Sequence, residues 1–281
     1  MHYRPFGPTG RQVSVIGMGT WLIDRADRKT AIAALQAALG LGMNHIDTAE
    51  MYGDAELVIK DAIHGRRDEA FLVSKVLPHN ASRAGTKRAC EQSLKRLGTD
   101  RLDCYLLHWH GSLPLGETIA AFEDLRREGK ILSWGVSNFD AEDLEQAHEI
   151  AASAGGSIAC NQVLYHLRER AIEHAVEPWC AGHSIAITAY SPFGHHDFPG
   201  AETRGGQLLN EIAQAHQATP RQVTLAFLVR SASVFAIPKA SNPQHVAENA
   251  EAASLVLSHE EISLIDRAFP RGPRPLVLPM I

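Results

Sequence analysis

The hydrophobic pattern of the chain alternates between two kinds of segment. Short runs rich in aliphatic and β-branched residues are separated by longer stretches whose apolar residues recur every three or four positions. The short runs are typical of buried β-strands, and the longer stretches are typical of amphipathic helices. Eight strands are predicted, at Val13–Gly19, Asn44–Asp47, Ala70–Lys75, Leu102–His108, Ile131–Val136, Ile158–Gln162, Ile185–Ala189 and Val234–Pro238.

Helices are predicted between these strands, and several of them carry boundary signals. Ser82 and the pair Asn242-Pro243 are typical of helix starts, while Gly98 and Gly129 are typical of helix ends. The helical stretches are Arg28–Gly40, Ala55–His64, Ser82–Leu97, Leu115–Glu128 and Asp140–Ala152, with later ones starting at His174, Gly206, Thr219 and Pro243.

Strands that alternate with helices about every 30 residues predict one parallel α/β domain over residues 1–281. The length suits an eight-fold β/α barrel, for which about 250 residues is usual. A doubly wound sheet is the alternative, but neither Gly17–Leu22 nor Gly40–Gly42 completes a dinucleotide-binding glycine motif. The tail, residues 270–281, has four prolines and no helical pattern. The sequence leaves open whether it folds over a pocket or lies loose.

Composition and charge narrow the functional classes. Apolar residues make up 45% of the chain and charged residues 21%, which excludes a disordered chain. The net charge is −5 and no Lys/Arg cluster is present, so no nucleic-acid partner is expected. No apolar run is long enough for a membrane span, and the start lacks a secretory signal. The four cysteines show no paired spacing, so we expect reduced thiols in a cytoplasmic protein.

Polar residues close nearly every predicted strand, where a purely structural barrel would place turn formers. In a β/α barrel the chemistry lies at the carboxyl ends of the strands, so these residues predict a site there. They are Asp47 with Tyr52 in the loop that follows, Lys75, His108, Ser137-Asn138, Asn161-Gln162, Tyr190-Ser191 and Lys239.

Four of these residues fit acid–base chemistry. An ordinary tyrosine has a pKa of about 10 and is a poor acid at neutral pH. The ammonium group of Lys75 would ease proton release from Tyr52, and Asp47 would balance the charge of a buried Lys75. His108 would hold a substrate oxygen against Tyr52. Singly, these residues also fit a helix cap, a loop aromatic, an exposed strand end and a core histidine, but on consecutive β/α units they indicate a site.

A metal site is the weaker interpretation of the histidines. His108 and His110 alternate on one strand and would share a face, but no carboxylate accompanies them. We therefore expect no metal, and a metal-dependent barrel hydrolase is a minor alternative. The pair His195-His196 is interpreted as part of a polar loop.

A set of motifs recurs in a fixed order along nearly the whole chain: GMGTW, DTAEMYG, SK, LLHW, GVSNF, NQVLYH, YSPFG and IPK. In these motifs and their spacing the sequence resembles the aldo-keto reductases. The resemblance implies an α/β fold with a single (β/α)8 TIM barrel, an N-terminal β-hairpin and extra C-terminal helices. The short loop after the fourth strand and the short tail are most similar to bacterial small-aldehyde reductases, including methylglyoxal reductases.

The resemblance also implies site residues. The catalytic tetrad would be Asp47, Tyr52, Lys75 and His108, with Tyr52 as general acid in the direction of reduction. NADPH would lie extended across the barrel mouth, and Tyr190 would stack on the nicotinamide. The cofactor-binding residues would be Gly19, Thr20, Trp21, Asp47, Ser137, Asn138, Gln162, Tyr190, Ser191, Pro192, Phe193, Gly194, Pro238, Lys239, Ala240, Ser241, His245, Glu248 and Asn249.

Two positions depart from the family pattern at the adenosine end. Ala240 replaces a frequent serine, and His245 stands where many members carry an arginine. A neutral imidazole binds a phosphate less strongly than a guanidinium group does. Lys239 still offers one fixed positive charge, so we expect NADPH as the cofactor and NADH as second choice.

The substrate would be a small, neutral carbonyl compound. Aromatic and apolar walls without a fixed charge suit such a molecule. The predicted function is therefore reduction of small aldehydes and ketones, such as methylglyoxal and other 2-oxoaldehydes, by an enzyme expected to be a monomer. A cofactor-binding regulatory subunit with little turnover is the alternative. The substrate-binding residues would be Trp21, Met51, Tyr52, His108 and Trp109.

Overall fold

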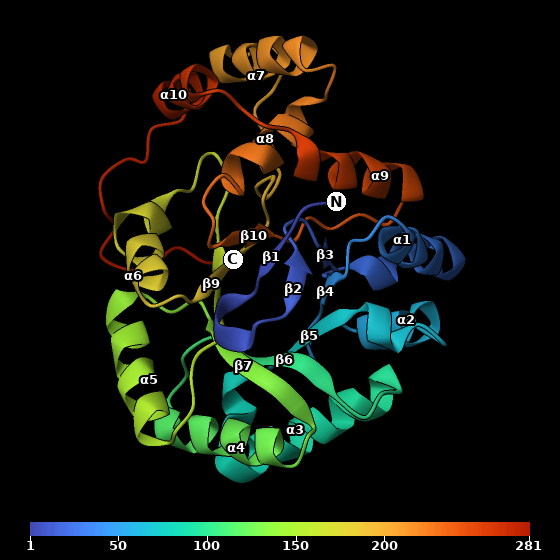
Figure 1. Ribbon diagram of the computed structural model, residues 1–281, viewed down its shortest axis with the longest axis vertical. Helices are drawn as coiled ribbons and strands as arrows, with labels where there is room; N and C mark the ends of the chain where they lie inside the picture. The colour runs from blue at the N-terminus through green and yellow to red at the C-terminus, as the bar shows by residue number, and fades with distance from the viewer.

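The computed structural model describes residues 1–281 and contains one eight-stranded parallel sheet surrounded by helices (Figure 1). Neighbouring strands follow one another along the chain, from β3 to β10. Each crossover between parallel strands passes outside the sheet, as β/α units require. The strands are β3 (Met18–Gly19), β4 (His45–Asp47), β5 (Phe71–Val76), β6 (Leu102–Leu107), β7 (Ile131–Ser137), β8 (Cys160–Leu164), β9 (Ala186–Tyr190) and β10 (Val234–Ala236).

Ten α-helices accompany the sheet, and most of them cover its outer face (Figure 1). Two of them, α7 and α8, lie between β9 and β10, and two more, α9 and α10, follow β10. The helices are α1 (Arg28–Gly40), α2 (Ala55–Ala62), α3 (Arg83–Leu97), α4 (Leu115–Arg127), α5 (Ala141–Ser153), α6 (Val176–Gly182), α7 (Arg204–Ala215), α8 (Pro220–Leu228), α9 (Pro243–Glu251) and α10 (His259–Ala268). None of the helices has the length and apolar character needed to cross a bilayer.

The two edges of the sheet meet. Parallel bridges join Ile16 to Ala236 and Gly19 to Lys239. The amide of Gly17 also donates to the carbonyl of Ala236 at 2.8 Å. Eight parallel strands whose first and last members are bridged are consistent with the predicted (β/α)8 barrel.

An N-terminal hairpin precedes the sheet, as expected. It consists of β1 (Tyr3–Pro5) and β2 (Gln12–Ser14), which pair antiparallel. The prediction of one strand over Val13–Gly19 is therefore wrong. Residues 12–14 pair with β1, and only Met18–Gly19 form a ladder with β4. The hydrophobic run was continuous because both pieces are buried, so the pattern alone did not show the break.

The hairpin closes the amino end of the barrel with Phe6. This ring is fully buried and packs against Phe71 and Phe235 at centroid distances of 4.8 and 5.1 Å. These rings belong to a cluster of ten buried residues in the interior of the barrel. A larger cluster of 65 buried residues includes the residues packed between the sheet and the helices. Burial of this much apolar surface is the main favourable contribution to folding.

Helix boundaries follow the capping chemistry. The Ser82 side chain accepts from the Gly85 amide, and Asn242 accepts from Gln244, which confirms both predicted helix starts. The start predicted at Gly206 is two residues late, because Thr203 caps α7 and so places its first residue at Arg204.

Two further boundaries differ from the predictions. Helix α6 begins at Val176 and not at His174, because residues 171–174 form a separate short 3-10 turn. Strand β8 lies two residues later than predicted, because its ladder with β9 continues as far as the pair Leu164 and Tyr190. Gln162 is therefore inside the strand and not at its end.

The C-terminal tail leaves α10, passes α6 and ends near the centre of the ring of strands in the view of Figure 1. Its start is tied down by Arg170, which donates to the carbonyl of Phe269 at 2.7 Å. His174 Nε2 lies 3.1 Å from the carbonyl of Gly272. Met280 and Ile281 line the cavity described below. Of the two alternatives that the sequence left open, the structure shows a tail folded over the pocket.

Candidate active site

A cavity of about 340 Å³ opens at the carboxyl ends of the strands. Residues on or just after seven of the eight strands, all but β5, contribute to its wall. This is where a β/α barrel places its chemistry. The lining residues are Gly19, Thr20, Trp21, Asp47, Met51, Tyr52, His108, Trp109, Ser137, Asn138, Gln162, Tyr190, Ser191, Ile237, Lys239, Met280 and Ile281. All five residues predicted to bind substrate are among them.

Asp47 and Lys75 form a buried ion pair beneath this cavity. Lys75 Nζ lies 2.6 Å from Asp47 Oδ1, and it also donates to the carbonyl of Thr48 at 2.7 Å. The second carboxylate oxygen of Asp47 accepts from Gln162 Nε2 at 2.7 Å. Both charged side chains are almost completely excluded from solvent. The pair is therefore held in one geometry by hydrogen bonds on both partners.

Burial and charge act in opposite directions on this pair. Burial alone would lower the pKa of Lys75, but the charges of Asp47 and Tyr52 more than offset it and raise the pKa above its ordinary value. Burial raises the pKa of Asp47, while Lys75 and Gln162 counteract this increase. Lys75 is therefore a cation at neutral pH and is held next to the site.

Tyr52 lies between Lys75 and His108. Lys75 Nζ is 4.9 Å from the centroid of the tyrosine ring, and Tyr52 Oη is 3.5 Å from His108 Nε2. Burial raises the pKa of Tyr52, although the charge of Lys75 acts to lower it. The net direction differs from the sequence-based expectation, which considered the ammonium but not the burial. The phenol thus keeps its proton at neutral pH.

His108 is a neutral imidazole in this setting. Burial, together with the charge of Lys75, lowers its pKa from 6.5 to about 2. Its Nδ1 is buried without a hydrogen-bond partner, while Nε2 faces Tyr52. The neighbouring His110 points elsewhere, because its Nδ1 lies 3.2 Å from Asp143. The two histidines therefore do not converge, and no group of three or more residues suited to a metal is present.

Amide and hydroxyl groups line the side of the cavity formed by β7, β8 and β9. Tyr190 donates its hydroxyl to Asn138 Oδ1 at 2.9 Å, and Asn138 Nδ2 donates to the carbonyl of His108 at 3.1 Å. Gln162 gives its amide hydrogen to Asp47, but its Oε1 makes no hydrogen bond within the protein. Ser137 donates to the carbonyl of Gln162. Through Gln162, the polar residues predicted at the strand ends are connected by hydrogen bonds to the Asp47–Lys75 ion pair.

The remaining predicted cofactor residues do not line this cavity. They lie on the loop after β9, on the segment after β10 and on α9. Lys239 reaches the cavity rim and lies 3.3 Å from the hydroxyl of Ser241. The residues outside the cavity are Pro192, Phe193, Gly194, Pro238, Ala240, Ser241, His245, Glu248 and Asn249.

Three residues of the cavity wall were missed by the sequence analysis. Ile237 precedes a proline and was interpreted only as part of a strand. Met280 and Ile281 belong to a tail without a periodic pattern, so no signal placed them at the site. Trp21, which was predicted, stacks on His195 with ring centroids 5.8 Å apart. The predicted polar loop therefore contacts the rim of the cavity.

The fold and this group of residues define a known class of protein. The sequence profile of the Aldo/keto reductase family matches residues 15–269. The chain belongs to this family, which confirms the resemblance inferred from the motifs.

Among characterised relatives, the methylglyoxal reductase YeaE of Escherichia coli (strain K12) is 44% identical over 274 residues, covering 95% of this chain and 94% of that protein. The glyoxal reductase of Bacillus subtilis (strain 168) is 32% identical and covers 92% and 89%. Among solved structures, an aldo/keto reductase from Klebsiella pneumoniae in complex with NADP and acetate has a TM-score of 0.92 at 44% identity, with 100% of both chains covered. Another from the same organism, in complex with NADPH, has a TM-score of 0.90 at 43% identity and covers 100% and 99%.

Proposed function

We propose that this protein is an NADPH-dependent reductase of small aldehydes and 2-oxoaldehydes, with methylglyoxal among its substrates. The observation that carries the proposal is one phenol, Tyr52, held beside a neutral imidazole and above a buried Lys75–Asp47 pair, inside a cavity of small-molecule size. The relatives named methylglyoxal reductase and glyoxal reductase, and the neighbours solved with NADP or NADPH, support it.

The wall residues fit a nicotinamide. Gln162 Oε1 is free to accept from an amide group, and the Ser137 and Asn138 side chains line the same cavity. Tyr190 lines the same cavity and offers an aromatic surface for stacking. Gly19 lies so close to the carbonyl of Ile237 that a side chain there would collide with it. The bound cofactor would supply a hydride to the carbonyl carbon.

Tyr52 would donate the proton to the substrate oxygen. The raised pKa keeps the phenol protonated at neutral pH, which is the form a general acid requires. When the proton leaves, the developing phenolate faces the Lys75 ammonium 4.9 Å from its ring. Asp47 and the Thr48 carbonyl hold that ammonium, and Gln162 in turn holds Asp47, so the charge is in place before the reaction begins.

His108 would position the substrate oxygen. A neutral imidazole with its hydrogen on Nε2 can donate to the oxygen that also receives the proton of Tyr52, because the two side-chain atoms lie 3.5 Å apart. Trp21, Met51 and Trp109 add an apolar wall around this point. The wall offers no charged side chain beyond the tetrad and Lys239, which favours small neutral carbonyl compounds over acids.

The test is consumption of reduced cofactor in the presence of a carbonyl panel. Methylglyoxal, glyoxal, a benzaldehyde and an aldehyde sugar are each assayed with NADPH and, in parallel, with NADH. We expect turnover with the small 2-oxoaldehydes and a higher kcat/KM with NADPH. Binding of NADPH without turnover of any carbonyl would contradict the proposal and favour the regulatory-subunit alternative.

A further inference from the structure

The loop that carries Tyr52 contains a second side chain held in a fixed position. It is Glu50, which is half-buried and lies outside the wall of the catalytic cavity. Its Oε1 accepts from the Leu77 amide at 2.7 Å and from Asn80 Nδ2 at 3.0 Å. Apart from Tyr52, it is the only residue of the loop 48–54 whose side chain makes a hydrogen bond. Glu50 therefore attaches this loop to the segment that follows β5.

The strand end to which Glu50 binds also holds His108. The carbonyl of Val76 accepts from the His108 amide at 3.0 Å, and the preceding carbonyl, of Lys75, accepts from the Glu50 amide at 3.3 Å. The loop that carries Tyr52 and the strand end that carries His108 are thus both bonded to the carboxyl end of β5. Three members of the proposed tetrad share this one point of attachment.

The segment after β5 is itself well fixed. It forms the 3-10 turn Pro78–Asn80, whose proline is buried and whose last amide donates to the Leu77 carbonyl at 2.9 Å. Gly111, in the loop after His108, lies so close to this proline that a side chain there would collide with it. A loop bonded to this turn is therefore held at a set distance from the loop of His108.

The reaction requires this distance to be set. Tyr52 and His108 must meet one substrate oxygen, and Tyr52 Oη lies 3.5 Å from His108 Nε2. Hydrogen bonds to an ionised carboxylate are stronger than those between neutral groups, so the two bonds to Glu50 are a firm attachment. A displacement of about 1 Å at a catalytic group can cost about 10²-fold in rate.

We infer that Glu50 is a positioning residue for Tyr52. It touches neither substrate nor cofactor and acts by binding the Tyr52 loop to the end of β5. Both of its partners are donors, so the property that matters is the acceptor oxygen and not the negative charge. The inference rests on the proposed function, in which Tyr52 supplies the proton.

Two substitutions of Glu50 test this role in the NADPH-dependent reduction of methylglyoxal. Glu50→Ala removes the acceptor and should lower kcat about 10- to 100-fold, while the Kd for NADPH stays close to the wild-type value. Glu50→Gln keeps an acceptor oxygen and should retain most of the wild-type kcat. The inference is overturned if Glu50→Ala reduces methylglyoxal at the wild-type rate, if both variants lose kcat equally, or if the loss in Glu50→Ala is entirely a loss of NADPH binding.

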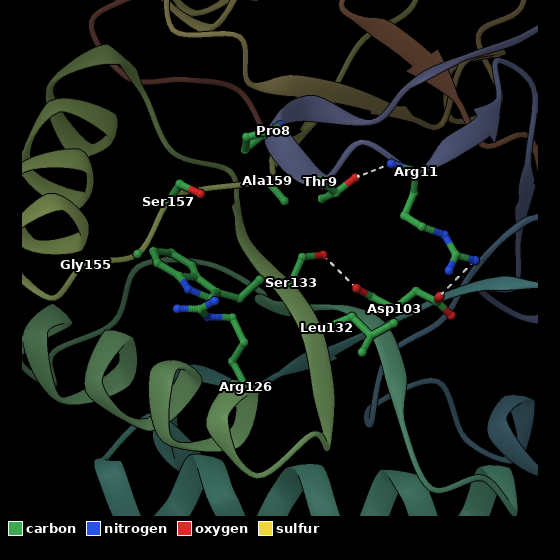
Figure 2. Close-up of a pocket in the computed structure, with 12 residues that line it drawn as sticks. Pro8, Thr9, Arg11, Asp103, Arg126, Leu132, Ser133, Gly155, Ser157 and Ala159 are labelled. Atoms are coloured by element: carbon green, nitrogen blue, oxygen red, sulfur yellow. Dashed lines mark hydrogen bonds and ion pairs between the residues drawn. The ribbon is translucent and has the colours of Figure 1, made fainter.

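Asp103→Ala is the matched control. Figure 2 shows Asp103 in the groove beside the N-terminal hairpin, at the other end of the barrel. Its Oδ2 accepts from the Leu72 amide of β5 at 3.0 Å and from Arg67 at 2.7 Å. Asp103→Ala therefore also removes a carboxylate bound to β5, and it should lower stability in urea without lowering kcat. An equal loss of kcat in Asp103→Ala and Glu50→Ala would show general loosening of the strand and would overturn the inference.

A spectroscopic signal of Tyr52 tests the same role without turnover. In protein labelled with ¹³C-tyrosine, the Tyr52 ring signal is identified by its loss in Tyr52→Phe. We expect Glu50→Ala to shift or broaden this signal, Glu50→Gln to leave it near its wild-type position, and the signals of Tyr3 and Tyr165 to stay unchanged in both. An unchanged Tyr52 signal in Glu50→Ala overturns the inference. Because no substrate is present, a wild-type protein that reduces no carbonyl would contradict the proposed function and leave this result to decide the role of Glu50.

Discussion

His45 provides a test of how the barrel interior responds to acid. The ring is fully buried beneath the catalytic pair and meets Phe6, Phe71 and Phe235 edge-on, and neither nitrogen has a hydrogen-bond partner. Burial, with a smaller contribution from the charge of Lys75, lowers its pKa from 6.5 to about 3. Between about pH 3 and about pH 6.5, the folded state thus keeps this histidine neutral while the unfolded chain protonates it.

The sign and size of the effect follow from proton linkage. Below a pH of about 6.5, His45 binds a proton in the unfolded state but not in the folded state. The free energy of unfolding therefore decreases as the pH falls toward about 3. Between about pH 7 and about pH 5 the loss from His45 alone is about 2 kcal/mol. His45→Leu keeps a similar volume and removes this term. The variant should therefore lose about 2 kcal/mol less stability than the wild type over that interval.

The assay is urea-induced unfolding followed by far-ultraviolet circular dichroism at the two pH values. His64→Gln, at an exposed histidine near the end of α2, is the control and should lose as much stability on acidification as the wild type does. His108 remains in both variants and continues to contribute its own acid sensitivity. An equal pH dependence in His45→Leu and the wild type would refute the reasoning, since it would mean that His45 gains a proton in the folded state.

Three further predictions concern the charged residues and the assembly. Lys75→Met should lower the free energy of unfolding by about 3–5 kcal/mol, because it leaves the buried Asp47 carboxylate without its cation. The double variant Lys75→Met/Asp47→Asn should recover part of this loss in urea unfolding, and no recovery would contradict the argument. Lys239→Ala should raise the KM for NADPH more than that for NADH, whereas the exposed Lys29→Ala should change neither. Equal effects of Lys239→Ala on both cofactors would exclude contact with the extra phosphate. The protein is expected to be a monomer, so light scattering coupled to size exclusion should give a mass near 30.7 kDa, and twice that value would show a dimer.

The sequence predicted the parts of the site that depend on strand ends. Asp47, Lys75 and His108 were identified because ionisable residues rarely end buried strands without a reason. Their convergence then followed from the rule that carboxyl ends of parallel strands share one face. Local chemistry and one topological rule were sufficient for these residues.

Other contacts depend on packing between distant segments, which a sequence pattern does not encode. Gln162 was predicted to hold the cofactor, but its hydrogen bond to Asp47 joins residues 115 positions apart. Met280 and Ile281 reach the cavity because the tail is anchored near Phe269, and no periodicity marks that path. The break in the first predicted strand likewise reflects pairing with β1 and not a change in hydrophobicity.

The central claim is that Tyr52 supplies the proton for carbonyl reduction, and the variant Tyr52→Phe tests it most directly. NADPH binding, measured by quenching of tryptophan fluorescence, and methylglyoxal-dependent oxidation of NADPH are compared in the variant and the wild type. Loss of the general acid should reduce kcat by about 10²–10⁴-fold while the Kd for NADPH remains close to that of the wild type. A variant that reduces methylglyoxal at the wild-type rate would contradict the account.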